Sequence, residues 1–219
     1  MNILAFDTSL NKTYIVLSKG DFTVSKIYES DENNYHSAYL ISGIKKLLEE
    51  NSITLKEIDF FAVNNGPGSF TGIRAGVTVA KTLAKELNKN VAGLNSLDIL
   101  YNAYQSLNPD IILDARRGQF YFRSTVSGSA NKSETKLIPY SEISNLITKN
   151  TIVCDASSIK SIKDYLQDKD INIINFEEDD INLSNALITL AKEYSNNDNL
   201  SWNTLSAAYI QAPPIHKKK

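Results

Sequence analysis

The spacing of hydrophobic positions in the first half of the chain predicts a mixed α/β lobe. Short apolar runs bounded by turn residues predict strands over 2–6, 13–18, 22–30, 58–65 and 90–94. Apolar residues at helical spacing predict helices from about Ser37, over 72–87 and over 96–106. The first helix has one expected apolar face, made of Leu40, Ile41, Ile44, Leu47 and Leu48. An antiparallel meander that leads into strand–helix–strand crossovers is typical of the actin-like (ribonuclease-H-like) fold.

Near residue 110 a similar pattern begins again. It predicts a strand–turn–strand unit over 110–126, a polar loop over 127–135, and strands at "TIVCDA" and "INIINF". Helices are expected near 141–149, 157–167 and 183–195. We therefore predict two lobes: residues 1–109, and a shortened, degenerate second lobe over 110–219 whose C-terminal helix has the option of returning to the first.

Composition narrows the class of protein. The formal net charge is −2, from 23 basic and 25 acidic residues, which argues against a protein whose main partner is a bare phosphate backbone. The basic cluster Lys217–Lys219 is expected to be a solvated tail. Cys154 is the single cysteine and lies in an apolar run, so we expect an inert core thiol. No apolar run has the length of a membrane span and the N-terminus lacks the pattern of a signal peptide, so we expect a cytoplasmic protein.

The stretch "NNGPGSFTGIRAG", residues 64–76, is rich in glycine in a chain with only 9 glycines. It follows a predicted strand and opens a predicted helix, and free amides at a helix N-terminus attract anions. It matches neither a Walker loop nor a clean dinucleotide fingerprint. Two interpretations stay open: a phosphate cradle, or a structural turn with Ser69 or Thr71 capping the helix. If a nucleotide or phosphate binds here, the residues expected to contact it are Asp7, Thr8, Ser9, Gly66, Gly68, Ser69, Thr71 and Gly72.

Other chemistry-bearing residues form no convincing catalytic set. Asp7, Asp114 and Asp155 end or open predicted strands, and Asp7 is open to a role as turn former or as metal ligand. His36 and His216 have no metal-ligand partner at helical spacing, and neither serine nor cysteine catalysis finds its partners. We predict no catalytic residues and no metal site. Arg74, one turn into the second helix, is suited either to a bound phosphate or to a carboxylate of a partner.

Four stretches together resemble the TsaB (YeaZ) family, over about the first 125 residues. They are "ILAFDTS", His36-Ser37 at a helix start, "NNGPGSFTGIRAG" and "DARRGQFYF". The resemblance implies an actin-like fold and a non-catalytic partner of the TsaD-type transferase, which acts in tRNA threonylcarbamoyladenosine synthesis. That transferase binds metal through two histidines on a helix. At the matching positions this chain has Ser96 and Leu100.

The resemblance also implies partners. We expect a heterodimer with the transferase, joined by a TsaE-type P-loop ATPase, and a homodimer when the chain is alone. tRNA is reached only through the complex, and no cofactor of its own is expected, since ATP and metal belong to the partner subunits. The expected contact residues lie on the first two helices: His36, Ser37, Leu40, Ile44, Leu47, Arg74, Ala75, Gly76, Val79, Ala80 and Leu83.

Competing interpretations remain at this point. A stand-alone weak ATPase, or an enzyme of the glycoprotease type, is the alternative to a scaffold subunit. A third interpretation is tRNA binding by the lysine tail. The glycine loop is expected mainly to position the second helix for docking, with nucleotide binding weak or vestigial.

Overall fold

The structure is a computed structural model of the 219-residue chain. It describes residues 1–29, 36–123, 134–167, 169–179, 181–197, 200–208 and 210. The chain forms two compact units. The first contains Met1–Ala103 and Ile181–Ala207, and the second is built on Tyr104–Asp180. The C-terminal helix therefore groups with the first unit.

The first unit holds a five-stranded sheet in the order β3-β2-β1-β4-β5. Its strands are β1 (Asn2–Asp7), β2 (Lys12–Lys19), β3 (Phe22–Glu29), β4 (Phe60–Gly66) and β5 (Asn90–Asn95). β1, β2 and β3 are antiparallel neighbours, whereas β4 pairs parallel with both β1 and β5. Gly20, at φ +58°, makes the tight turn between β2 and β3, a conformation that costs glycine little.

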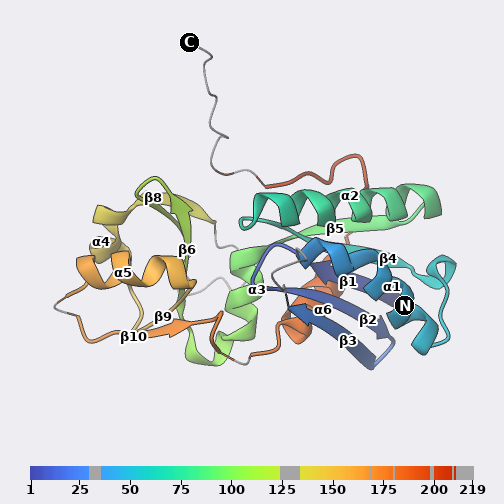
Figure 1. Cartoon of the computed structure of the whole chain (residues 1–219), viewed down its shortest axis with the longest axis horizontal. Helices are drawn as coiled ribbons and strands as arrows, with labels where there is room; N and C mark the ends of the chain where they lie inside the picture. Colours follow the sequence, from blue (N-terminus) through green and yellow to red (C-terminus); the bar gives the residue numbers. More distant parts are fainter. Residues whose placement is uncertain are drawn as a thin grey trace, which may run out of the picture. The chain divides into compact units, whose positions relative to one another are not determined.

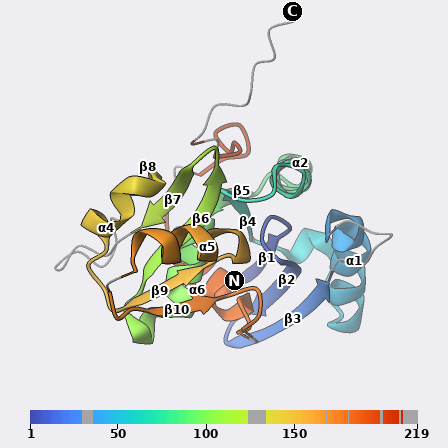
Figure 2. The same ribbon diagram turned by 60° about the vertical axis from the view of Figure 1, so that its left-hand side comes forward.

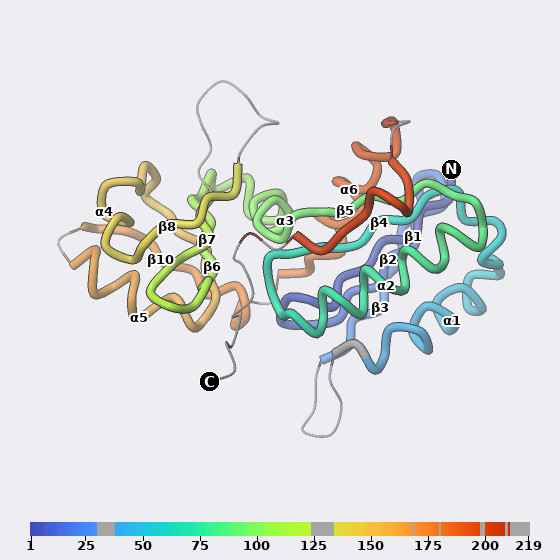
Figure 3. Tube along the Cα trace, turned by 90° about the horizontal axis from the view of Figure 1, so that it is seen from above, coloured from blue at the N-terminus to red at the C-terminus, as the bar shows by residue number. Residues whose placement is uncertain are grey.

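Helices cover both faces of this sheet (Figure 1). One face carries α1 (Leu40–Glu50) and α2 (Phe70–Leu87), and the other carries α3 (Ser96–Ala103) and α6 (Ser184–Tyr194). α1 packs on β2 and β3, while α2 packs on β4 and β5. Figure 3, seen from above, shows α1 and α2 running side by side along the same face.

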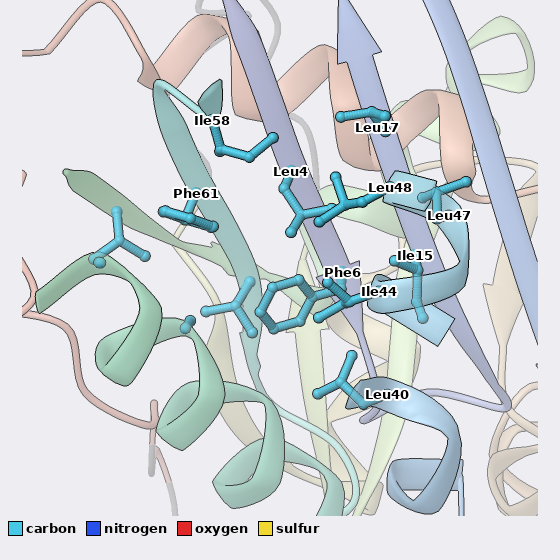
Figure 4. Packing of buried hydrophobic residues seen from close by; sticks show 14 of the residues in the cluster. Leu4, Phe6, Ile15, Leu17, Leu40, Ile44, Leu47, Leu48, Ile58 and Phe61 are labelled. Atoms are coloured by element: carbon cyan, nitrogen blue, oxygen red, sulfur yellow. The ribbon is translucent and has the colours of Figure 1, made fainter. Parts of the chain in front are cut away.

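The core between that face and its two helices is apolar and closely packed. Alternate residues of β1 and β2 point into it, because successive side chains of a strand face opposite sides. Figure 4 shows Leu40, Ile44 and Leu47 of α1 directed at Phe6 and Ile15 of the sheet. Ile41 is an exception to the predicted face: it is 60 % exposed, because it lies one residue, or about 100°, around the helix from Leu40.

The second unit repeats this plan. Its sheet has the order β8-β7-β6-β9-β10, with β6, β7 and β8 antiparallel and β9 parallel to β6 and β10. The strands are β6 (Asp110–Arg116), β7 (Gln119–Arg123), β8 (Lys136–Pro139), β9 (Thr151–Cys154) and β10 (Asn172–Asn175). Its helices are α4 (Ile143–Leu146) and α5 (Ala156–Tyr165), which Figure 2 shows with the strands of this unit.

The strand orders of the two units match one to one, so each unit has the same topology. The predicted actin-like (ribonuclease-H-like) fold is confirmed. Several sequence-based bounds need correction. α3 ends at Ala103 and not at 106, the helix expected over 141–149 is a short turn followed by the four-residue α4, and β8 was not predicted at all.

Candidate functional site

The glycine loop joins the end of β4 to the start of α2. Ser69 is the N-cap of α2, and its side-chain oxygen accepts a hydrogen bond from Gly72 N at 3.3 Å. α2 therefore begins at Phe70, two residues earlier than predicted. At Gly66 the backbone has φ +110°, which favours glycine.

The loop packs directly on the turn between β1 and β2. Ser69 N donates to Ser9 O at 2.9 Å, and Thr8 Oγ1 donates to Gly72 O at 2.7 Å. A Cβ atom on Gly72 would overlap Thr8 O, and one on Gly68 would lie 2.6 Å from Ser9 O. These glycines therefore give room to the chain's own backbone.

Asp7 lies at the end of β1, beneath this contact, and is fully buried. Its Oδ1 accepts hydrogen bonds from Ser9 N and Ser9 Oγ, both at 2.7 Å, while Oδ2 has no hydrogen-bond partner among the described residues. Burial raises the pKa of Asp7 to about 6, with the hydrogen bonds from Ser9 opposing the shift. Tyr14, opposite Asp7 on β2, has its own pKa raised by burial and by the Asp7 charge.

Asn64 and Ser96 join the neighbouring strand ends. Asn64 Oδ1 accepts from Ser96 Oγ at 2.8 Å and from Gly66 N at 3.0 Å. Ser96 and Leu100 are both completely buried on α3. Among the described residues no group of His, Cys, Asp and Glu could hold a metal ion.

The predicted nucleotide residues thus gather in one place, where β1 and β4 end and α2 begins. Asp7, Thr8, Ser9, Gly66 and Gly72 are buried, whereas Gly68, Ser69 and Thr71 are exposed. The amides of Ser69 and Gly72 already have acceptors within the chain. Phosphate binding by this loop stays a prediction, and a phosphate that used these two amides would have to displace their internal acceptors.

Part of the predicted contact set faces the interior of the first unit, and partner contact by these residues stays a prediction. Leu40, Ile44, Leu47, Gly76 and Ala80 are buried against the chain's own sheet. The contact residues were taken from the family resemblance, and these five occupy the apolar face that each helix buries. The backbone at His36 and Ser37 forms a 3₁₀ turn, and their side chains lie outside the described part of the structure.

The remaining contact residues lie on the opposite side of α2. We define the outer face of α2 by exposed and half-exposed residues along one side of the helix: Phe70, Arg74, Ala75, Thr78, Val79, Thr82 and Leu83. Phe70 is 52 % exposed, and the Arg74 guanidinium lies over its ring, 5.1 Å from the centroid. Arg74 is the charged residue in this set, and the exposed Lys85 and Glu86 add further charges on the same side near the end of the helix.

Acidic residues of the second unit are engaged in local hydrogen bonds. Asp155 caps α5 by accepting from Ser158 N at 3.1 Å, and it also accepts from Asp114 N. Asp114 Oδ1 accepts from Arg116 N and Tyr140 Oη, both at 2.8 Å. These carboxylates stabilise turns and a helix start. Burial raises the pKa of the Cys154 thiol to about 12, which fits an inert core residue.

Residues 28–146 match the family model described as TsaD: tRNA N6-adenosine threonylcarbamoyltransferase. A Buchnera aphidicola protein (from Schizaphis graminum) named "tRNA threonylcarbamoyladenosine biosynthesis protein TsaB" is 30% identical over 67% of this chain and 73% of its own length. The chain belongs to the TsaB family. The Bacillus subtilis TsaB is 36% identical over 55% of this chain and 53% of its own length.

Two solved structures share the fold of this TsaB-family chain. "YeaZ from Pseudomonas aeruginosa" has a TM-score of 0.75 at 19% identity, covering 95% of this chain and 99% of that one. A Pseudomonas aeruginosa protein "with similarity to peptidase YEAZ" has a TM-score of 0.78 at 20% identity, covering 96% and 99%. No helix in the described residues has the length and apolarity to cross a membrane.

Proposed function

We propose that this chain is a non-catalytic scaffold subunit of the complex that makes threonylcarbamoyladenosine on tRNA. Its relatives are named for that pathway, and the family model that matches it is that of the transferase itself. The chain would bind a TsaD-type transferase as a heterodimer, with a TsaE-type ATPase joining them. ATP, metal and tRNA would be handled by the partners.

One observation carries this proposal: the glycine loop is filled by the chain's own β1–β2 turn. Gly72 packs on Thr8 O and Gly68 on Ser9 O, so a space that could admit a ligand is taken by protein. Without a metal cluster in the described residues, this place offers hydrolysis little support. What the tight packing does provide is a fixed position for the start of α2.

The outer face of α2 is the docking surface that we propose. Its small residues Ala75, Thr78 and Thr82 allow another helix to approach closely. Ile41 on α1, 60 % exposed, adds apolar surface. The same face would pair with a second copy of the chain when the transferase is absent, because such helix faces are self-complementary.

Light-scattering chromatography of the chain mixed with the transferase of its own organism tests the proposal. Ala75→Glu places a charge on the outer face of α2 without entering the core, and it should abolish the heterodimer and the modification of tRNA. Thr189→Glu is the matched control, because Thr189 is exposed on α6, over the opposite face of the sheet. If Ala75→Glu keeps the heterodimer, the docking surface is wrong.

The same experiment tests whether the chain is a scaffold subunit at all. If the wild-type chain forms no heterodimer and the transferase modifies tRNA without it, the scaffold role is refuted. ATP hydrolysis by the purified chain that is lost in Asp7→Ala would then favour the alternative of a stand-alone ATPase.

A further inference from the structure

Residues 201–207, which follow α6 in the first unit, run beside α2; we call this segment the C-terminal strap (Figure 1, red). Leu205 is its anchor. It is only 5 % exposed and belongs to the core cluster that α1 and α2 cover. Burying a leucine side chain contributes about 1.5–3 kcal/mol, so the strap is held in place by packing as well as by polar contacts.

Residues of three elements, α2, β4 and β5, contact the strap. Lys81 Nζ of α2 donates to Leu205 O at 3.0 Å, and Asn65 Nδ2 of β4 donates to Ser206 O at 2.9 Å. On β5, Gly93 has no side chain at the place where Asn65 and Leu205 meet, and an added Cβ would lie 3.1 Å from Leu205 Cδ1. Two consecutive carbonyls of the strap thus have donors from different elements.

A fourth contact secures the strap near the end of α2. The ammonium of Lys85 lies over the ring of Trp202, 5.3 Å from its centroid. Together these contacts reach from Asn65, directly before the glycine loop, to Lys85, near the C-terminus of α2. α1 lies over β2 and β3, and the strap meets α2 on the side of β5. The strap therefore contacts α2 through Lys81 and Lys85, and none of these contacts uses Ala75 or Thr78 of the outer face.

We propose that the C-terminal strap is a positioning element for the docking helix, and that Leu205 sets the affinity of α2 for its partner without touching that partner. The proposal rests on the scaffold function proposed above. Helix docking depends on close side-chain packing. Because the core is closely packed, a change at Leu205 shifts α2, and the shift alters how α2 fits its partner. Residues that act through such a network change a binding free energy without contacting either site.

Leu205→Ala tests this inference directly, because Trp202 is the only tryptophan in the chain and reports on strap attachment. Acrylamide quenching of Trp202 fluorescence measures whether the strap leaves α2. Titration calorimetry with the TsaD-type transferase measures the dissociation constant. Leu17→Ala is the matched control, since Leu17 on β2 is buried in the same core cluster and loses the same atoms.

Trp202 is 37 % exposed in the wild type. We expect Leu205→Ala to increase its quenching by acrylamide and to raise the dissociation constant about tenfold, as indirect positioning residues do. Leu17→Ala, studied where both variants are fully folded, should change neither quantity. An unchanged dissociation constant with an exposed Trp202 would overturn the inference, as would equal weakening by Leu17→Ala.

If Leu205→Ala does not fold, Lys81→Met removes the bond to Leu205 O while keeping a long side chain on α2. A smaller shift in the same direction is then expected for both measurements, and no shift in either overturns the inference. Failure of the wild-type chain to bind the transferase would refute the proposed function, and this inference with it. That result is distinguishable because it appears before any variant is made.

Discussion

Asp7 should destabilise the folded chain at neutral pH, and Asp7→Asn should relieve that cost. Burial raises the pKa of this carboxyl from 3.8 to about 6. The folded state therefore binds the proton more tightly than the unfolded state does. The contribution of Asp7 to stability is full below about pH 4 and is lost as the pH rises to about 6. A shift of about two units corresponds to about 3 kcal/mol of unfolding free energy.

Asp7→Asn keeps an oxygen that can accept from Ser9 but carries no charge at any pH. We expect it to be about 3 kcal/mol more stable than the wild type at pH 7.5, about 1 kcal/mol more stable near pH 4.5, and equally stable only near pH 3. Urea unfolding across this pH range, followed by circular dichroism, measures the effect. Asp21→Asn is the control, because Asp21 is exposed and the same substitution there should change little.

A result in the opposite direction would refute this reasoning. If Asp7→Asn is less stable than the wild type at pH 7.5, the ionised carboxylate has a stabilising partner, and desolvation does not dominate. If the gain is the same at every pH, its origin is packing or hydrogen bonding and not the charge of Asp7.

The remaining predictions concern packing. Gly72→Ala should destabilise the chain by about 3 kcal/mol, since its Cβ would overlap Thr8 O, whereas Gly20→Ala meets open space and should cost only about 1 kcal/mol for its left-handed backbone. Thermal unfolding of the two variants compares them, and equal losses would contradict the packing argument. Leu47→Ala should cost about 2–5 kcal/mol because Leu47 is buried, while Ile41→Ala should change stability by less than about 0.5 kcal/mol and weaken transferase binding instead. Urea unfolding and calorimetry separate these effects, and a large stability loss in Ile41→Ala would place that residue in the core.

Elements whose burial follows a simple period could be predicted from the sequence. β1 and β4 are continuous apolar runs because they are buried on both faces, and α2 shows a regular apolar stripe. The sequence predicted that a similar pattern begins again near residue 110, but not that the two strand orders match one to one, because equal strand order does not require equal residues. β8 was missed because "KLIP" is too short to show a period, and only its pairing with β7 makes it a strand.

Some of the predicted contact residues are buried and others lie on the outer face of α2, and this division has a physical reason. A helix on a sheet has one periodic face, and sequence periodicity finds that face because it is apolar. Leu40, Ile44 and Leu47 were expected at a partner contact because the family resemblance implies one on these helices, yet they pack on the sheet of their own unit. The outer face of α2 mixes threonine, alanine and arginine with Phe70, Val79 and Leu83, and this mixture produces no clear periodic signal. Such a docking surface is recognised only after the structure has shown which residues face the core.

The glycine loop shows why its sequence left two interpretations open. Glycine is required wherever another group approaches the backbone closely, and the sequence does not tell whether that group is a phosphate or a peptide. Here the group is the Thr8–Ser9 turn, more than fifty residues earlier in the chain, and the contact exists only because β1 and β4 are parallel neighbours. A loop of this kind gains stability from being filled internally, and a phosphate would have to compete with bonds that are already made. The packing that fixes the start of α2 also engages the amides of Ser69 and Gly72, so a phosphate that used them would have to break contacts that hold the helix we propose as the docking surface.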